Sequence, residues 1–326
     1  MRIVAFFNNK GGVGKTSLVY HLAWMYSGLG RSVVAADLDP QANLTAMFID
    51  DHSLEPLWED QSRGTIHGAI EPLLEGTGDV GSPHLAERSL GLHLVVGDPK
   101  LAAAEDEISG QWTGCLDRKP RAFRVVSALW RALRRAAAAA EADLVLVDVG
   151  PNLGALNRSA LVATDYVVVP LTSDLYSLQG LRSLGPTLRG WRGQWAERQA
   201  HNPVEDLALP DGAMRPIGYV VMQQAIPHDR PVLAYQRWAD RIPGVYSREV
   251  CGRDPQSALT VSDDPNCLSI LKHYRSLMPM AQEARKPMFA LEPADGAIGG
   301  HTRAVRDCYN DFRELAEAIL DRVDTG

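Results

Sequence analysis

Nine consecutive residues near the start of the chain combine glycines, lysines and hydroxyl groups in the spacing of a phosphate-binding loop: Asn9-Lys10-Gly11-Gly12-Val13-Gly14-Lys15-Thr16-Ser17. Glycines allow backbone N–H groups to approach phosphate oxygens without clashes from Cβ atoms. The N-terminus of a following helix adds partial positive charge. We expect Lys15 to reach the β- and γ-phosphates of a nucleotide, the Thr16 hydroxyl to bind Mg²⁺, and the segment from Gly11 to Ser17 to cradle the phosphates.

The alternative is a chance glycine turn, which requires several coincidences because glycine makes up only about 7% of average sequences. The segment departs from the standard G-x-x-x-x-G-K-[ST] pattern, since Asn9 stands at the first glycine position and Lys10 adds a second lysine. Lys10 precedes the closest approach of the loop to phosphate, so its own nucleotide need not be its target. A merely solvated lysine is the alternative for Lys10.

The elements around this loop are typical of a parallel crossover unit. Residues 2–8 form a continuous apolar run, as expected for a strand buried on both faces. Leu18, Leu22, Met25 and Leu29 then mark one face of a helix, and residues 31–37 predict a second strand. The chain therefore opens as strand, loop, helix and strand in fewer than about 40 residues.

The rest of the chain continues this alternation, which predicts one α/β domain with a doubly wound, mostly parallel sheet flanked by helices. Further strands are expected at 92–96, 143–149, 166–170 and 217–222. Helices are expected at 121–141, 153–163, 176–198 with an interruption near Gly185-Pro186, and 301–323. Residues 50–91 and 224–265 are rich in turn-forming residues and are expected to be two irregular insertions in this single domain of residues 1–326.

The composition narrows the class of protein. A formal net charge of -7 argues against a general nucleic-acid coat, although it allows a local basic patch. The four cysteines form no CxxC pair, so a disulfide framework or thiolate metal site is not expected, and a reducing cytoplasm is the simplest location. No apolar run approaches the roughly 18 residues needed to cross a bilayer.

Four segments together resemble the ParA/MinD-type ATPases, which carry a deviant Walker A loop with an early lysine. The first is the phosphate loop with Lys10 and Lys15. The second, Asp37-Leu38-Asp39-Pro40-Gln41-Ala42-Asn43-Leu44-Thr45, is similar to the DxDPQxNxT segment of that family. The others are Leu144–Pro151, similar to its Walker B strand and second switch, and Tyr166–Leu171 followed by Leu178-Gln179-Gly180-Leu181. The resemblance covers about residues 1–47 and 142–185, and the two insertions have no counterpart in a compact ParA protein.

The resemblance implies a role for each matching residue. Lys10 would cross a homodimer interface and contact the nucleotide of the partner, so Lys10, Lys15 and Asp39 would be catalytic. Asp39 would position or activate the attacking water. Asp37 would support the Mg²⁺ shell, and Asp148 would hold Mg²⁺ through water, together with Thr16. The alternatives are an Asx turn next to Pro40 for the first two acids and a strand-end cap for Asp148.

Two further features bear on ligands and partners. Gln223 ends the predicted strand 217–222 where the base pocket of the family lies, so it is a candidate to bind adenine, although such a residue more often only finishes a strand. Residues 118–135 and 182–198 are rich in arginine, the latter with Trp191 and Trp195 interleaved, and could bind DNA nonspecifically. A solvated helix face whose arginine stems cover the core is the equal alternative.

The sequence therefore predicts an ATP-dependent, dimerising switch ATPase of the ParA type that acts in DNA partition or cargo positioning, stimulated by an unknown protein partner. The alternative is an ATP-switched regulator of a protein complex that does not bind DNA. Membrane binding is disfavoured because the C-terminal helix is acidic. A small-molecule enzyme built on the two insertions stays open. Trp58, Trp238 and Tyr246 could anchor a partner, although buried core is the other interpretation for each.

Overall fold

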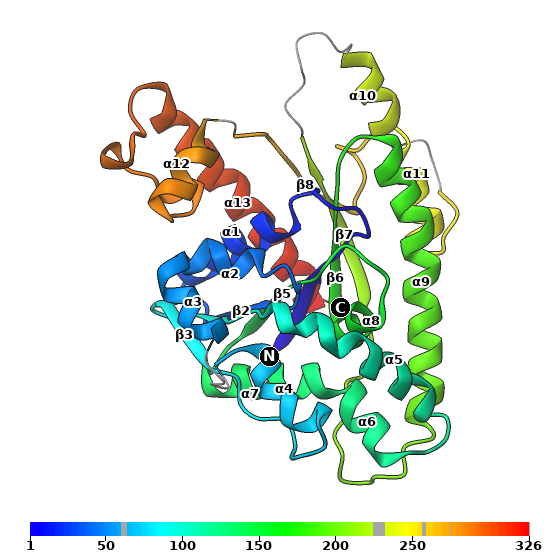
Figure 1. Ribbon diagram of the computed structural model, residues 1–326. Helices are drawn as coiled ribbons and strands as arrows, with labels where there is room; N and C mark the ends of the chain where they lie inside the picture. The colour runs from blue at the N-terminus through cyan, green and yellow to red at the C-terminus, as the bar shows by residue number, and fades with distance from the viewer. Residues whose placement is uncertain (60–63, 224–231, 256–258, 275, 326) are drawn as a thin grey trace.

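One sheet organises the part of the chain that the computed structural model describes, which is residues 1–59, 64–223, 232–255, 259–274 and 276–325. Within these residues the sheet has eight strands in the order β3-β4-β2-β5-β1-β6-β7-β8 (Figure 1). The strands are β1 (Arg2–Phe6), β2 (Val33–Asp37), β3 (Leu85–Ser89), β4 (Leu92–Val95), β5 (Leu144–Asp148), β6 (Tyr166–Leu171), β7 (Arg215–Met222) and β8 (Cys267–Leu271). Neighbouring strands are parallel except β3 and β4, so the predicted doubly wound α/β fold is confirmed.

The three central strands β2, β5 and β1 are buried along almost their whole length, which explains their continuous apolar sequence. Their register aligns the carboxyl ends: Phe6 lies opposite Asp148, and Asp148 lies opposite Asp37. The residues after these strands therefore share one edge of the sheet, the usual place for ligand sites in open α/β folds.

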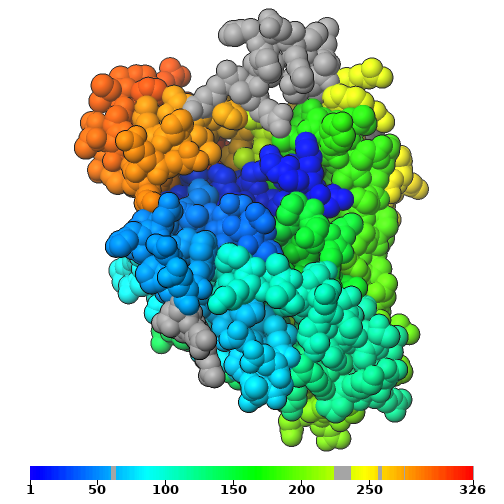
Figure 2. Space-filling view, viewed as in Figure 1, coloured from blue at the N-terminus to red at the C-terminus, as the bar shows by residue number. Residues whose placement is uncertain are grey.

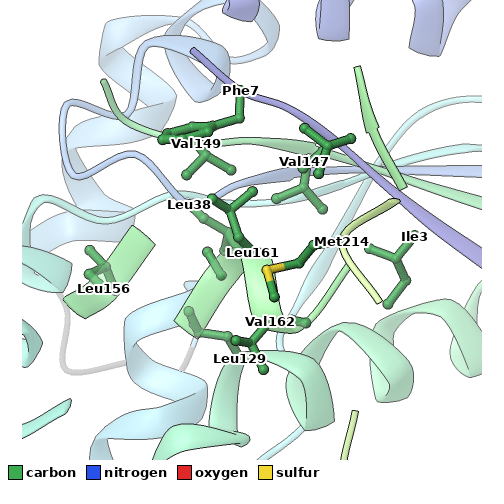
Figure 3. Close-up of a cluster of buried hydrophobic side chains, with 14 of the residues drawn as sticks. Ile3, Phe7, Leu38, Leu129, Val147, Val149, Leu156, Leu161, Val162 and Met214 are labelled. Atoms are coloured by element: carbon green, nitrogen blue, oxygen red, sulfur yellow. The ribbon is translucent and has the colours of Figure 1, made fainter. Parts of the chain in front are cut away.

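Helices cover both faces of the sheet. One face packs against α1 (Lys15–Gly28), α2 (Asn43–Phe48), α12 (Leu277–Ala284) and α13 (Gly300–Thr325). The other face packs against α4 (Ile66–Leu74), α5 (Ala104–Gly114), α6 (Pro120–Val126), α7 (Ala128–Ala139), α8 (Ala155–Val162), α9 (Leu175–Gln199) and α11 (Ile242–Val245). Figure 3 shows part of this second core, where side chains of strands and helices meet. The two hydrophobic cores therefore hold the strand ends in place from opposite faces of the sheet.

Two helix predictions need correction. The helix expected at 121–141 is two helices, because the chain leaves helical geometry at Ser127, whose hydroxyl bonds back to the Phe123 carbonyl. The interruption expected near Gly185-Pro186 is wrong, since α9 continues through Pro186. Packing explains this: a Cβ atom on Gly185 would lie 1.8 Å from the Glu249 carbonyl oxygen in η2 (Tyr246–Val250). The glycine is there for close contact between helices.

Both segments expected to be irregular insertions contain regular elements. Residues 50–91 include α3 (Asp51–Glu59), α4 and the edge strand β3. Residues 224–265 include α10 (Val232–Ala239), α11 and η2, while 224–231 and 256–258 lie outside the described residues. The sequence interpretation missed β3 and β8, whereas the C-terminal helix expected at 301–323 is α13. The remaining short helices are η1 (Pro99–Ala103), η3 (Met288–Ala290) and η4 (Pro293–Asp295).

Candidate active site

The glycine-rich loop joins β1 to α1 in a geometry that suits an anion. Gly12 and Gly14 have φ angles of 71° and 83°, which side chains with a Cβ atom rarely adopt. Gly14 stands at the N-cap of α1, where no described side chain caps the helix and the first turn holds no acid. The first amides of α1 are therefore free to donate to phosphate oxygens, supported by the helix dipole.

The Lys15 side chain lies inside this loop and is 7% exposed. Its ammonium donates to the carbonyl oxygens of Asn8 at 3.2 Å and of Lys10 at 3.3 Å. Burial lowers the pKa of Lys15, and the nearby carboxylates of Asp148 and Asp39 oppose this shift. A buried lysine beside acids and an uncapped helix is the arrangement that a triphosphate with a divalent cation requires.

The departure at Asn9 has a structural reason. The Asn9 side chain donates to the Ser183 hydroxyl of α9 at 2.8 Å. A Cβ atom on Gly180 would lie 2.9 Å from the Asn9 amide oxygen, so the glycine of Leu178-Gln179-Gly180-Leu181 makes room for it. Asn8 donates to the Pro170 carbonyl of β6 at 2.7 Å. The Pro170 backbone carbonyl of β6 and the Ser183 hydroxyl of α9 thus anchor the start of the loop.

The Lys10 side chain pairs with the segment that follows β6. Its ammonium donates to the Thr172 hydroxyl at 2.8 Å and to the Asp174 carboxylate at 2.5 Å. Asp174 also caps α9 by accepting from the Ser177 amide. Burial alone raises the pKa of Asp174, but the hydrogen bonds from Lys10, Thr172 and Ser177 hold it below its usual value. Lys10 and Lys15 therefore have different partners although they share one loop.

Asp148 ends β5 beneath the loop, and it is 1% exposed. Neither of its carboxylate oxygens has a hydrogen-bond partner among the described residues. Burial and the neighbouring Asp37 raise the pKa of Asp148, while the Thr16 hydroxyl and Lys15 oppose the shift. Two buried, unpartnered oxygens close to a threonine hydroxyl fit the oxygen donors that Mg²⁺ prefers.

Asp37 is fully buried opposite Asp148, and both of its carboxylate oxygens accept hydrogen bonds. One oxygen accepts from the Asp39 amide at 3.3 Å, and the other accepts from the Thr45 amide and from the Thr45 hydroxyl, both at 2.8 Å. The Thr45 hydroxyl in turn accepts from the Gly97 amide at 2.8 Å. A Cβ atom on Gly97 would lie 2.8 Å from the Asp37 carboxylate. Burial raises the pKa of Asp37, and the hydrogen bonds from Thr45 oppose this. This network orients Asp37 toward the site.

Asp39 lies at the same edge and is 8% exposed. Its carboxylate accepts from the Gln41 amide at 3.0 Å, the turn geometry expected next to Pro40. A Cβ atom on Gly150 would lie 3.2 Å from the same carboxylate, so the loop after β5 packs against Asp39. Asp39 therefore forms the expected Asx turn, and the same carboxylate lies against the loop that follows β5.

A cleft of about 480 Å³ opens beside the loop. It is lined by Gly12, Val13, Gly14, Ser17, Thr172, Met222, Gln223, Leu271, Lys272, His273, Tyr274, Met278, Met288 and Phe312. The Gln223 amide completes the sheet by donating to the Leu271 carbonyl at 2.9 Å, and its residue lines the cleft. Figure 2 shows the first residues of the chain, in dark blue, at the surface between the orange C-terminal region and green residues. The volume of the cleft falls within the range of small-ligand pockets.

A family model described as AAA domain matches residues 1–198. The chain belongs to this family. The resemblance to ParA/MinD-type P-loop ATPases is confirmed as well, because curated relatives that match more than half of this chain bear partition names. The chromosome-partitioning ATPase Soj of Thermus thermophilus is 35% identical over 188 residues, covering 58% of this chain and 61% of Soj. The chromosome partitioning protein ParA of Myxococcus xanthus is 34% identical over 190 residues, covering 57% of this chain and 58% of ParA.

One solved structure shares the fold of this chain over nearly its whole length. Protein DIP2308 from Corynebacterium diphtheriae superposes with a TM-score of 0.73 and 22% identity, covering 99% of both chains. That likeness concerns the fold alone. The chain spans only about three fifths of the length of the two curated relatives.

Most arginines of the two basic segments have partners inside the molecule. In residues 118–135, Arg121 bonds to the Leu73 and Leu74 carbonyls, and Arg131 pairs with Asp79. In residues 182–198, Arg192 bonds to the Ala213 and Met214 carbonyls. Trp191 and Trp195 are buried in the core. The interpretation in which arginine stems cover the core therefore accounts for these side chains.

Two other expectations can be compared with the structure. Tyr246 is fully buried, so it cannot anchor a partner, whereas Trp58 and Trp238 are partly exposed and Trp58 donates to the Gly97 carbonyl. In the ranges that the structure describes, we find no helix with the length and apolar character of a membrane span.

Several residues of the site were not predicted from the sequence. They are Gly97, Asn157, Thr172 and Asp174, and no role was assigned to Thr45 and Gly150 although both lie in the segments that carry the resemblance. For Thr172 and Asp174 a signal existed, because polar residues directly after a buried strand also marked Asp37 and Asp39. Gly97 carried no such signal, since its role depends on a contact with Asp37 that only the folded sheet creates.

Proposed function

We propose that this protein binds ATP with Mg²⁺ at the Gly11–Ser17 loop, hydrolyses it to ADP and phosphate, and switches between nucleotide states as a homodimer. One observation carries the proposal: a buried lysine and a buried, unpartnered carboxylate, Asp148, meet beneath an uncapped helix N-terminus in the described part of the chain. The amides of Gly12 to Ser17 and Lys15 would hold the phosphates. The cleft lined by Gln223 would take the adenine.

The acids have separate tasks in this proposal. Thr16 and Asp148 would hold Mg²⁺, with Asp37 behind them, and the cation when bound would neutralise charge on the phosphate oxygens. Asp39 would orient the attacking water. Water forms a bond to the γ-phosphorus, the bond to the bridging oxygen of ADP breaks, and the proton of the water leaves with the phosphate or solvent.

Lys10 would complete the site of the partner chain. Its ammonium lies at Thr172 and Asp174 rather than in its own loop, and it is 24% exposed, so it is accessible to a second copy. A cation that arrives late at the γ-phosphate would stabilise the transition state, as an arginine finger does in other phosphoryl-transfer enzymes. Release from Asp174 would be required first.

The names of the relatives support partition of DNA or positioning of another large cargo as the task. An unknown protein partner would stimulate turnover. A second candidate function is regulation of a protein complex without DNA, and it is favoured by the internal partners of Arg121, Arg131 and Arg192. A salt titration of DNA binding with and without ATP separates the two. A steep salt dependence seen only with ATP supports the first, and no binding at low salt supports the second.

Substitution of Asp39 tests the reaction itself. Asp39→Ala should retain ATP binding and dimerisation, because the residue does not line the loop, and should reduce hydrolysis by at least about a hundredfold. Turnover by Asp39→Ala at the rate of the unmodified protein would rule out this role. Asp106→Ala, on the exposed side of α5, is the matched control and should not change turnover.

A further inference from the structure

Residues 150–154 join β5 to α8 and touch the candidate active site. Gly150 packs so closely against Asp39 that a Cβ atom on this glycine would lie 3.2 Å from the Asp39 carboxylate. The loop contains Pro151, Asn152 and Leu153, and Leu153 is exposed. The conformation of residues 150–154 therefore sets the distance between the Gly150 backbone and the Asp39 carboxylate.

Asn157 holds the loop from inside the molecule. This side chain is fully buried in α8, and its amide nitrogen donates to the Gly150 carbonyl at 2.8 Å. The same nitrogen is 2.9 Å from both the carbonyl and the side-chain oxygen of Asn152. The Asn157 oxygen has no partner among the described groups. Leaving the N–H donors of a buried amide unpaired costs free energy. The bonds from the Asn157 amide nitrogen to Gly150 and Asn152 therefore hold this loop in place.

Glu105 of α5 fixes the other end of the loop. One carboxylate oxygen accepts from the Ala155 amide at 2.6 Å, and the other accepts from the Leu156 amide at 2.8 Å. A Cβ atom on Gly154 would lie 2.6 Å from Glu105, so the glycine lets the carboxylate reach the start of α8. A carboxylate at this position satisfies free amides and complements the helix dipole.

The helix that carries Glu105 packs against α8 and α9. Two guanidinium groups lie over the ring of Trp112 in the same helix, with Arg158 of α8 at 4.2 Å and Arg198 of α9 at 4.4 Å from the ring centroid. Trp195 stacks beside it, with ring centroids 5.9 Å apart. This cluster joins α5, α8 and α9 and so links the helix that carries Glu105 to the helix that Glu105 caps.

We propose that Asn157 is a positioning residue for the hydrolysis reaction, and that Glu105 supports it by fixing the end of the same loop. Asn157 holds Gly150 against Asp39, and thereby sets the orientation in which Asp39 meets water. The inference rests on the proposed function. It assigns no contact with nucleotide to either residue, so they should affect turnover rather than ATP affinity.

The test compares Asn157→Ala and the near-isosteric Asn157→Asp with a matched control, Asn202→Ala. Asn202 also bonds to nearby backbone, at Val204, but far along the chain from the site. Both Asn157 variants should lower kcat by about tenfold and leave KM for ATP within about twofold, since both lose the amide donors to the loop and Asn157 is assigned no contact with the nucleotide. Amide hydrogen exchange should accelerate at residues 150–156 in these variants, and Asn202→Ala should change neither measurement.

Several results would overturn the inference. Normal kcat and normal exchange in Asn157→Asp would show that the donors do not position the loop. A lowered Tm with unchanged kcat would show a purely structural role. If the Asn157 variants fail to fold, the Glu105 variants take their place. Glu105→Ala should lower kcat, and Glu105→Gln, which retains one acceptor, should have an intermediate kcat. A kcat equal to that of the unmodified protein in both Glu105 variants would contradict the proposal. Absence of ATP hydrolysis by the unmodified protein would instead defeat the proposed function.

Discussion

At the scale of single residues, two lysines in one loop occupy different surroundings. Lys15 is buried against the carbonyls of Asn8 and Lys10, whereas the Lys10 ammonium is partly exposed and pairs with Asp174. The side chains of this ion pair are 24% and 26% exposed, so solvent reaches it in part. A role in the partner chain requires Lys10 to leave Asp174.

Lys10→Ala tests that role. ATP affinity of the single chain should stay within about twofold, because the Lys10 ammonium is bonded to Thr172 and Asp174, whereas hydrolysis that rises with protein concentration should disappear. Turnover measured over a range of protein concentrations checks this, with exposed Lys100→Ala as the control. Hydrolysis by Lys10→Ala that still rises with concentration would reject the trans role.

The sequence indicated the phosphate loop through the spacing of its glycines and lysines between a strand and a helix, and its acids through the resemblance to the ParA/MinD-type ATPases. The sequence also showed that Asn9 departs from the standard phosphate-loop pattern, but it could not explain this departure. The reason is a contact with Gly180, which lies about 170 residues away in the chain and only approaches Asn9 after α9 has packed on the sheet. A contact between a glycine and a loop that lie far apart in the sequence leaves no local sequence pattern.

At the scale of elements, α9 shows why a local rule failed. Pro186 removes one hydrogen bond, which predicts a break. The helix nevertheless continues, because its Gly185 face packs against the backbone of η2, more than about 60 residues later in the chain. The same dependence on a distant partner explains why β8 was missed, since it forms only beside β7.

Gly185→Ala should therefore destabilise the protein by about 2 kcal/mol or more, because the added Cβ overlaps the Glu249 carbonyl. Gly190→Ala on the same helix is the matched control, since no described atom lies within 4 Å of its Cβ position. It should be neutral or stabilise by up to about 1 kcal/mol. Equal urea midpoints for the two variants would contradict the packing of α9 on η2.

His21 links α1 to the C-terminal elements. Its Nδ1 atom lies 2.7 Å from the Ser17 carbonyl, and its Nε2 atom accepts from the Met288 amide at 3.2 Å. Its ring also stacks on Phe312 of α13. Burial lowers the pKa of His21 to about 4, and the hydrogen bond to Ser17 opposes this. The folded protein therefore requires neutral His21.

A lowered histidine pKa gives a defined dependence of stability on pH. The contribution of neutral His21 is complete above about pH 6.5 and is lost as pH falls toward 4, because the unfolded chain takes up the proton first. The raised pKa values of Asp37 and Asp148 act in the opposite direction, so the comparison must be with His21→Gln. The stability advantage of the unmodified protein should shrink by about 3 kcal/mol over that window in urea unfolding. An advantage independent of pH would contradict the neutral, buried state.

At the scale of the whole molecule, the two cores hold the sheet from opposite faces and leave its carboxyl edge to the site. The loop, Asp37, Asp39 and Asp148 come from three separate strand ends, and the segment between β6 and α9 supplies Asp174 from a fourth. The cleft beside them combines β7, β8 and α13, so residues from both ends of the chain meet there. Nucleotide binding should thus stabilise the entire fold.

Calorimetric titration with ATP and Mg²⁺ tests the central claim most directly. The unmodified protein should bind one nucleotide per chain, and Lys15→Ala should give no binding heat while Lys100→Ala binds normally, because the Lys15 ammonium and the loop amides together hold the triphosphate. Absence of binding heat for the unmodified protein, or equal affinity in Lys15→Ala, would contradict it.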